Sequence, residues 1–403
     1  MNKNKKWGED VYSLLSWFKI DKVKNAKVLV AGAGALGNEA LKNLALFGVG
    51  NIVVVDFDKI EHSNLTRSIL FRESDADKGL YKAEVAAKRI KEINPAINTF
   101  AICGNLATDV GLGLYRRMDV ILGCLDSLIA RILLNRLSFR AGKTWIDGGI
   151  GDLEGQVNSF HINKNCYECS LTAEEHEDLE ARMSCAGVSR ENESFGRVAT
   201  TPVSASIIAA VQVQEAMKVI HEDELGTDVF TPLMGKMFQY EGLHPAAGIF
   251  EDTSYNEDCP SHEHWDKIIE IPQLGADMSV REALSLIKST LNVESVEINM
   301  LNDKFVDILG SRSDNKVYYP LLPESKIPDY KESSEELSSL SFMEGEPYQR
   351  AFENIDDEFP YPELTLKQIG IPYWDVLQIS TENDYFYVEM SADKDKYKDL
   401  FVS

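Results

Sequence analysis

The chain has 403 residues, too long for one average domain and long enough to bury one large core and a smaller one. Its formal net charge is −24 at pH 7. Because affinity for nucleic acid comes mainly from clustered Lys and Arg, this charge argues against a nucleic-acid partner and favours protein or small-molecule partners.

The N-terminal sequence, the apolar stretches and the cysteines bear on the cellular compartment in which the protein is expected. The N-terminal sequence MNKNKKWGED is basic, with no apolar segment and cleavage site behind it, so we expect no secretion signal. We also expect no apolar stretch close to the roughly 18 residues that span a bilayer, and hence no membrane partner. Six cysteines fit a reducing compartment, where close spacing indicates metal binding or catalysis. We predict a cytoplasmic protein.

The first part of the chain alternates strand and helix patterns. Lys27–Ala31 is an apolar strand, a Gly-rich turn follows, and Asn38–Phe47 has apolar residues at helical spacing. Further elements are expected at Asn51–Asp56, Tyr81–Asn94, Phe100–Cys103, Val120–Leu125, Leu128–Ala141, Thr144–Asp147 and Val203–Val219. This alternation predicts an α/β, Rossmann-like domain with a mostly parallel sheet.

The pattern changes after about Trp265, where we expect a smaller α+β domain. Its expected elements are Met278–Leu291, Ser295–Met300, Phe305–Leu309, Leu364–Ile379 and Tyr385–Met390. A stretch rich in acids and serines, at about 325–362, predicts a solvated insertion. We therefore expect one domain at 1–266, with a crossover loop at about 165–201, and a second at 267–403.

A Gly-rich turn marks a nucleotide site. Gly32, Gly34 and Gly37 form G-x-G-x-x-G between a predicted strand and helix, where glycine lets the backbone approach phosphate and the helix N-terminus attracts it. Asp56 follows at the distance expected for an acid that binds a ribose hydroxyl. Alone, this pattern would favour an NAD-dependent oxidoreductase.

Polar residues beyond Asp56 shift that interpretation. Asn64 and Arg67 in SNLTR, and Lys82 in GLYKAE, supply the polar and cationic groups that a triphosphate needs. Asp126, in the strand-end sequence VILGCLDS, suits a Mg²⁺ ion held against phosphates. Singly, Arg67 or Lys82 fits a solvated surface charge and Asp126 a helix cap. Their joint order favours ATP.

The chain resembles a known family, the ubiquitin-activating enzymes and the bacterial relatives that adenylate the molybdopterin and thiamine sulfur carriers. The resemblance covers roughly Val28–Ile220 and rests on GAGALG, KNL, DFDKIEHSNLTRSILF, GLYKAE, CLDSLIAR and TTPVSASIIAAVQVQEAMK. It implies that Asp56 binds the ribose, that Asn64, Arg67 and Lys82 bind the phosphates, and that Asp126 binds the metal.

The resemblance also implies a reaction. The C-terminal glycine carboxylate of a small β-grasp protein would attack the α-phosphate of ATP. Because that carboxylate is already ionised, we expect catalysis by charge neutralisation and alignment, through Arg67, Lys82 and the metal, with no side-chain base.

One segment departs from the family. Relatives usually carry Tyr-x-Arg-Gln before the first strand, and its Arg reaches the partner's ATP site in a homodimer. This chain has EDVYSLLSWFKIDKVKNAK there and no Arg before Arg67. The arginine is therefore missing or replaced by Lys19, Lys22 or Lys24.

Two pairs of metal-ligand residues lie far apart in the sequence, Cys166 with Cys169 and Cys259 with His262. Tetrahedral zinc accepts three thiolates and one imidazole, and such sites join distant segments. Together with the resemblance, which places zinc at these two points, the spacing predicts structural Zn²⁺. His264 is the alternative ligand, and two unrelated pairs are the simpler interpretation.

The other cysteines divide by context. Cys103 and Cys124 lie in predicted apolar strands and are expected to pack there. Cys185 lies in a polar segment, where the resemblance places a cysteine that takes the acyl group from AMP as a thioester. Arg182, Arg190 or a helix N-terminus would favour its thiolate. The alternative is a free loop cysteine in an enzyme that releases the acyl-adenylate or makes a persulfide.

The last third resembles the ubiquitin-fold domain that docks the conjugating enzyme in ubiquitin-like activating enzymes. The match rests mainly on Leu366–Ile371 running into Val376–Ile379, and an appendage used only for stability is the simpler interpretation. We expect an enzyme that adenylates a ubiquitin-like protein, forms a thioester on Cys185 and transfers it to a conjugating enzyme. The compact chain suggests a bacterial conjugation operon or an early-branching homodimeric enzyme. The alternatives are a sulfur-carrier adenylyltransferase and a non-catalytic scaffold.

Overall fold

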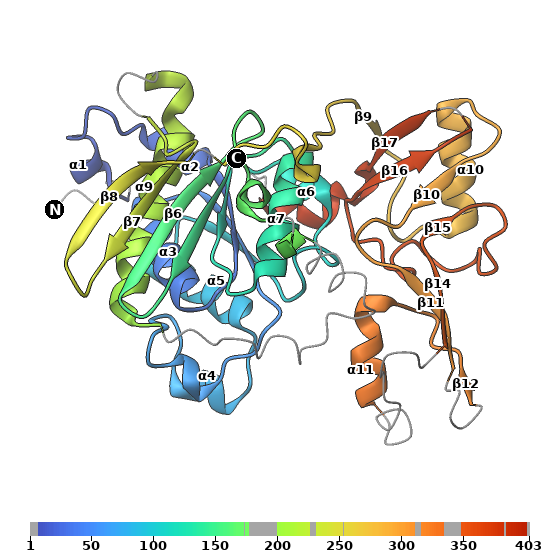
Figure 1. Ribbon diagram of the computed structural model, residues 1–403, viewed down its shortest axis with the longest axis horizontal. Coiled ribbons are helices and arrows are strands. Elements are labelled where there is room, and N and C mark those ends of the chain that lie inside the picture. Colours follow the sequence, from blue (N-terminus) through green and yellow to red (C-terminus); the bar gives the residue numbers. More distant parts are fainter. Residues whose placement is uncertain are drawn as a thin grey trace.

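The large sheet organises the first part of the chain (Figure 1). The structure is a computed structural model, and it describes residues 7–172, 174–176, 200–225, 231–252, 254–310, 316–333, 348–382 and 384–400. The sheet has the strand order β3-β2-β1-β4-β5-β6-β7-β8. Its strands are β1 (Lys27–Ala31), β2 (Asn51–Val55), β3 (Asn98–Ile102), β4 (Val120–Gly123), β5 (Trp145–Ile150), β6 (Glu154–Phe160), β7 (Lys236–Glu241) and β8 (Ala246–Glu251).

Side chains of the central strands point alternately to the two faces of this sheet, and each face has its own hydrophobic core. In β1, Val28 and Val30 face one core while Leu29 and Ala31 face the other. The first core is covered by α3 (Ala35–Phe47), α5 (Lys82–Ile93) and α9 (Pro202–Leu225). The second is covered by α6 (Leu112–Arg116) and α7 (Leu128–Arg140). The predicted α/β class is confirmed.

The sheet changes character at β5. The pairs β1·β2, β1·β4, β2·β3 and β4·β5 are parallel. From β5 to β8 the pairing is antiparallel. The sequence did not lead us to expect β6, β7 and β8, whereas the expected strands and helices before them lie within a few residues of the observed ones.

Helix α9 corrects one expectation about apolar stretches. Pro202–Glu222 is long and apolar enough to cross a membrane by length and composition alone, so our expectation of no such stretch is wrong. Of its apolar window, 56% is buried inside the protein. The helix packs against α3 and β5, which is the position of a core helix.

The C-terminal part forms a second, smaller unit (Figure 1). A five-stranded sheet has the order β15-β10-β16-β17-β9, in which the first and last strands of the unit, β9 and β17, pair in parallel. Helix α10 (Val280–Leu291) packs its apolar side against this sheet, and the two form the hydrophobic core of the unit. The strands are β9 (Ile268–Ile271), β10 (Glu297–Asn299), β15 (Asn354–Ile355), β16 (Val376–Ser380) and β17 (Tyr385–Met390). The ubiquitin-fold interpretation stays a prediction.

A small second sheet includes part of the stretch where we expect an acidic insertion. Strand β11 (Phe305–Gly310) pairs with β12 (Val317–Tyr318), β13 (Leu322–Pro323) and β14 (Tyr348–Phe352). Helix α11 (Ile327–Glu332) buries Ile327 against it. The stretch at 325–362 is therefore structured at both ends, and residues 334–347 lie outside the described residues.

The two units share one hydrophobic core at their junction. Trp374 of the second unit is 2% exposed and packs in the second core of the large sheet, the one that α6 and α7 cover. Its carbonyl accepts a hydrogen bond from Gly113 at 2.9 Å, and the Asp375 carboxylate accepts one from the Leu112 backbone at 2.8 Å. A Cβ on Gly113 would lie 2.4 Å from the Trp374 carbonyl oxygen, so this approach requires glycine.

A buried carboxylate adds charge to this junction. The Glu389 side chain is fully buried and accepts two hydrogen bonds from Arg117, both at 2.8 Å. It also pairs with Arg116 and accepts from the Trp374 indole at 2.9 Å. Removing one partner of such a buried group leaves charges without compensation.

We expect Glu389→Gln to lower the free energy of unfolding by about 2 kcal/mol, less than a fully buried pair would lose because both arginines are partly solvated. Urea denaturation would measure this. The control is Glu270→Gln, which removes an exposed partner of Arg117 and should cost under about 0.5 kcal/mol. Equal losses in the two variants would show that the buried carboxylate does not hold the units together.

Candidate functional site

The Gly-rich turn lies where the strand order of the large sheet reverses. Strand β1 lies between β2 and β4, so the loops that follow β1 and β4 diverge, and open α/β sheets bind ligands in the resulting crevice. Gly32 has φ 94°, and a Cβ there would lie 2.3 Å from the Cys124 carbonyl oxygen. A Cβ on Gly37 would lie 2.1 Å from the Gly32 carbonyl oxygen. These two glycines are required by the turn itself.

Gly34 is different. It precedes α3 with φ −74°, and a Cβ on it would meet no atom within 4 Å. The protein alone therefore does not require glycine at this position. The open space at a helix N-terminus is where a phosphate group can approach the backbone.

This contrast gives a test. We expect Gly34→Ala to leave the unfolding temperature nearly unchanged but to weaken ATP binding about tenfold or more, because the methyl group would occupy the phosphate position. Gly37→Ala should instead lower the unfolding temperature, since its Cβ clashes with backbone. Thermal denaturation and calorimetric titration with ATP would measure both. Unchanged ATP affinity in Gly34→Ala would remove this turn from the binding site.

Asp56 lies beside the turn, at the end of β2. Its carboxylate accepts hydrogen bonds from the backbone of Ala33 at 2.7 Å and of Asp58 at 2.8 Å. Burial raises its pKa, although Lys82 and these two hydrogen bonds act in the opposite direction. The carboxylate is thus fixed against the Gly-rich turn, as an acid that binds a ribose would need to be.

Lys82, the first residue of α5, points to the same place. Its ammonium group pairs with the Asp58 carboxylate at 2.7 Å, and its backbone donates to the Asp58 carbonyl at 2.9 Å. Burial acts to lower the pKa of Lys82, but the nearby carboxylates of Asp56, Asp58 and Asp126 together raise it above its ordinary value. Lys82 is therefore a firmly protonated cation with Asp56 and Asp126 within electrostatic reach.

The remaining predicted phosphate ligands lie on a short 3₁₀ helix, η1 (His62–Asn64), and just after it. The Asn64 side chain accepts from the Glu61 backbone at 2.9 Å, and Arg67 donates to the Ser63 carbonyl at 2.9 Å. Both are half-buried, while Asp126 is exposed at the end of β4. The described contacts bring Asp56, Lys82 and Asp126 together, and they show Asn64 and Arg67 only in bonds to their own segment.

Two residues that the sequence analysis missed fix the loop that carries Asp126. Arg131 donates to the Leu125 carbonyl at 2.8 Å and to the buried Asp147 carboxylate at 3.2 Å. Gln212, from α9, donates to the carbonyls of Gly123 and Ile146, both at 2.8 Å. Two sequence features could have identified these residues. Arg131 ends the CLDSLIAR segment, and Gln212 is a polar residue in an apolar helix.

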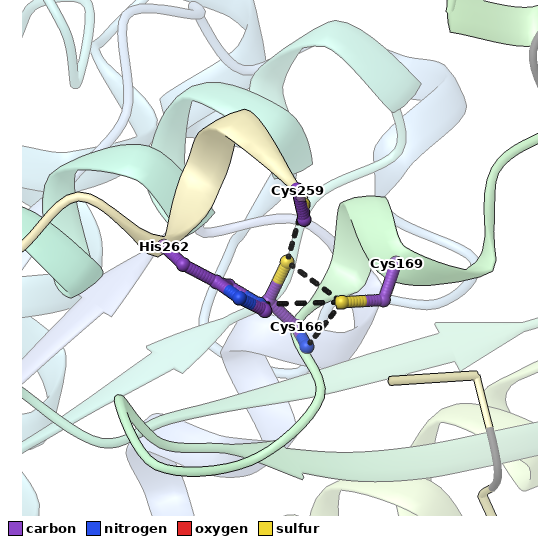
Figure 2. Close-up of side chains that lie close together, drawn as sticks. All are labelled: Cys166, Cys169, Cys259 and His262. Atoms are coloured by element: carbon purple, nitrogen blue, oxygen red, sulfur yellow. Dashed lines mark hydrogen bonds between the residues drawn. The ribbon is translucent and has the colours of Figure 1, made fainter. Parts of the chain in front are cut away.

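The four predicted zinc ligands form one cluster (Figure 2). The sulfur of Cys166 lies 3.5 Å from that of Cys259 and 3.7 Å from that of Cys169. The Cys169 sulfur lies 3.2 Å from Nε2 of His262. Around a tetrahedral zinc with Zn–S bonds of about 2.3 Å, neighbouring sulfurs would be about 3.8 Å apart. The spacing and the three-thiol, one-imidazole donor set are compatible with zinc.

The surroundings orient these ligands. His262 stacks between Phe139 and Tyr255, each with ring centroids 5.4 Å from its own. Glu168 is buried in η2 (Tyr167–Ser170), between Cys166 and Cys169 in the sequence; it pairs with Arg136 at 2.8 Å and accepts a hydrogen bond from Ser261. Ser261 lies between the ligands Cys259 and His262, so its bond to Glu168 joins the segment of Cys166 and Cys169 to the segment of Cys259 and His262.

Three other predictions can be compared with the structure. His264 lies against Gly142 and outside the cluster, so His262 is the histidine that joins the cysteines. Cys124 is buried as expected, but Cys103 is exposed because it follows the end of β3, and the prediction that it packs is wrong. Cys185 lies outside the described residues.

The proposed substitutes for the family's arginine lie next to α9. The Lys19 backbone donates to Nε2 of His221 at 3.0 Å, and Lys22 and Lys24 lie on the following helix, α2 (Ile20–Asn25). Trp17 and Phe18 contact the same buried imidazole. The role of these lysines stays a prediction.

Comparisons with known proteins find similar sequences. A model of the ThiF family matches residues 7–261. The chain is 31% identical over 229 residues to the sulfur carrier protein adenylyltransferase of Thermus thermophilus, over 55% of this chain and 77% of that protein. It is 36% identical over 155 residues to SUMO-activating enzyme subunit 2 of Dictyostelium discoideum, over 38% of this chain and only 23% of that protein.

Similar solved structures support the fold. Escherichia coli MccB with ATP has a TM-score of 0.50 and 23% identity, over 65% of this chain and 75% of that chain. The microcin C7 biosynthetic enzyme MccB in complex with N-formylated MccA has a TM-score of 0.51 and 24% identity, over 65% and 76%. At these identities the similarity concerns the fold alone.

Proposed function

The chain belongs to the ThiF family, and on that premise we propose that it uses ATP to adenylate the C-terminal carboxylate of a ubiquitin-like or sulfur-carrier protein. The observation that carries this proposal is the convergence of Asp56, Lys82 and Asp126 beside the open space at Gly34. A site for hydride transfer would not need that cation and that second acid.

The residues divide the binding of ATP among them. Asp56 is suited to accept hydrogen bonds from the ribose, and the backbone around Gly34 to receive phosphate. Lys82 and Arg67 supply positive charge for the phosphates, with Asn64 as a further polar contact. Asp126 would hold a Mg²⁺ ion, which when bound neutralises phosphate charge.

The reaction needs alignment and neutralisation. A carboxylate oxygen of the carrier attacks the α-phosphorus, a new P–O bond forms, and the bond to the bridging oxygen of the β-phosphate breaks as pyrophosphate leaves. No proton moves, because the carboxylate is already ionised. Lys82 and Arg67 lower the repulsion between the two anions, and the rigid Gly-rich turn holds the α-phosphate in line.

We further propose that the acyl group passes from AMP to Cys185 as a thioester, and then to a conjugating enzyme docked on the C-terminal unit. Similarity to a SUMO-activating subunit supports this extension. Similarity to a sulfur carrier adenylyltransferase supports the second candidate, in which no conjugating enzyme takes part. A homodimer is part of both proposals.

The test is incubation with magnesium, ATP and candidate β-grasp proteins that end in glycine. ATP–pyrophosphate exchange measures adenylation, and a non-reducing gel detects a thiol-sensitive adduct. An adduct lost in Cys185→Ala but kept in Cys103→Ser, which removes an exposed cysteine, supports the thioester. Exchange without an adduct selects the sulfur-carrier candidate. Nucleotide binding without exchange, across all carriers, selects a non-catalytic scaffold.

A further inference from the structure

A buried asparagine lies directly behind the Gly-rich turn. Asn38, in the first turns of α3, is 0% exposed. Its Nδ2 donates to the carbonyls of Ala33 at 2.7 Å and of Gly34 at 2.9 Å. Its Oδ1 accepts from the backbone N–H of Leu70 at 2.8 Å. One side chain thus bonds to two consecutive peptides of the turn and to a segment 32 residues away.

These bonds set the direction of the backbone donors. In a trans peptide the C=O and the N–H point in opposite directions. The Gly34 carbonyl also accepts the backbone N–H of Asn38 at 2.9 Å, so the helix itself holds it, and the side chain adds the bond that turns the Ala33 carbonyl the same way. With both carbonyls directed towards the helix, the N–H groups of Gly34 and Ala35 point away from it, towards the open space at Gly34. Backbone N–H groups aimed into such a space form an anion site.

The third bond ties this turn to the segment that carries the predicted cations. Leu70 is buried and lies three residues after Arg67. The Asn38 bond therefore fixes the chain just after Arg67 relative to the Gly-rich turn. No other described side-chain hydrogen bond joins these two segments directly.

We infer that Asn38 is a positioning residue that sets the Gly-rich turn and the Arg67 segment in register for the nucleotide phosphates. This inference rests on the proposed use of ATP. The role requires an amide, because the side chain must donate to two carbonyls and accept from an N–H at once. A carboxylate of the same shape would face the two carbonyls with lone pairs, and a leucine would make none of the three bonds.

The experiment compares Asn38→Leu with a matched control, Asn94→Leu. Asn94 is 1% exposed and donates to the carbonyl of Ala45, near the other end of α3, at 3.0 Å. It also accepts from the Ala96 backbone at 3.1 Å. Asn38 lies on α3 and Asn94, at the end of α5, bonds to α3, so both variants lose hydrogen bonds of a buried amide at this helix, but only Asn38 adjoins the turn. The probe is the magnesium complex of a non-hydrolysable ATP analogue, titrated calorimetrically, which needs no carrier protein.

We expect Asn38→Leu to weaken binding of the analogue about tenfold or more, and Asn94→Leu to change it by less than about twofold. In exchange assays, the KM for ATP should rise in Asn38→Leu while the KM for the carrier stays within about twofold. Asn38→Ser, whose hydroxyl can still donate to one carbonyl, keeps the test available if the leucine variant does not fold, and should bind with intermediate affinity.

The outcomes separate the two proposals. If the wild type binds the analogue but exchanges nothing, the proposed function fails and the calorimetric comparison still tests Asn38. If Asn38→Leu, or Asn38→Ser in its place, binds as tightly as Asn94→Leu, Asn38 is merely a structural residue and the inference is overturned. It is also overturned if the wild type binds no analogue.

Discussion

Replacing Lys82 with methionine is expected to lower ATP–pyrophosphate exchange about 10²- to 10³-fold, the loss typical when one group that stabilises developing charge is removed. Methionine keeps the length and the apolar stem of the side chain. It removes an ammonium group whose pKa the acids around it raise in spite of burial, so the wild-type group is charged at neutral pH. The exchange rate with a fixed carrier protein is the measurement.

A matched variant separates the charge from the ion pair. Lys82 pairs with Asp58, whose side chain is 48% exposed, so breaking the pair should cost little stability. Asp58→Asn breaks the same pair but keeps the ammonium group, and we expect it to retain exchange within about tenfold of the wild type. If Asp58→Asn loses as much activity as Lys82→Met, the ion pair matters and the proposed phosphate contact of Lys82 is wrong.

The Gly-rich site could be predicted because its chemistry follows chain order. Strand, turn and helix are adjacent in sequence, and Asp56 and Asp126 each follow a strand end, so parallel pairing alone brings their loops to one edge of the sheet. The cluster of three cysteines and one histidine was predictable for a different reason. Each of its two pairs has the close spacing that a tetrahedral site uses, and four such ligands have few other reasons to meet.

The supporting residues were not predictable because their partners are backbone groups far away in the chain. Asn38 accepts from the Leu70 backbone N–H and Gln212 donates to carbonyls of two strands, β4 and β5, and no periodicity records such contacts. Strand β8 was missed since nearly all of its residues are exposed, which removes the alternation that predicts a strand. The prediction that Cys103 packs in a strand was wrong because β3 ends one residue before it. The apolar sequence continues past that end, so it does not reveal that Cys103 is exposed.

The second large effect concerns the metal cluster. We expect Cys169→Ser to reduce bound zinc from about one equivalent to near none and to lower the unfolding temperature by roughly 8–16 °C. The cluster joins segments that are 93 residues apart. A covalent cross-link that closes a loop of this length stabilises a protein by about 4–5 kcal/mol, and a tightly held metal acts on the unfolded chain in a similar way. Metal analysis and thermal denaturation would measure the two effects.

Two controls test whether the effect belongs to the cluster. Cys103→Ser removes a thiol outside it, and His264→Asn removes the alternative histidine beside Gly142. Both should keep the wild-type metal content. Chelation of the wild type should reproduce the loss of stability seen in Cys169→Ser, because both changes remove the metal ion that links the two segments. A wild type that contains no metal, and whose unfolding temperature a chelator does not change, would show instead that hydrogen bonds such as those between Glu168, Arg136 and Ser261 suffice to join these segments.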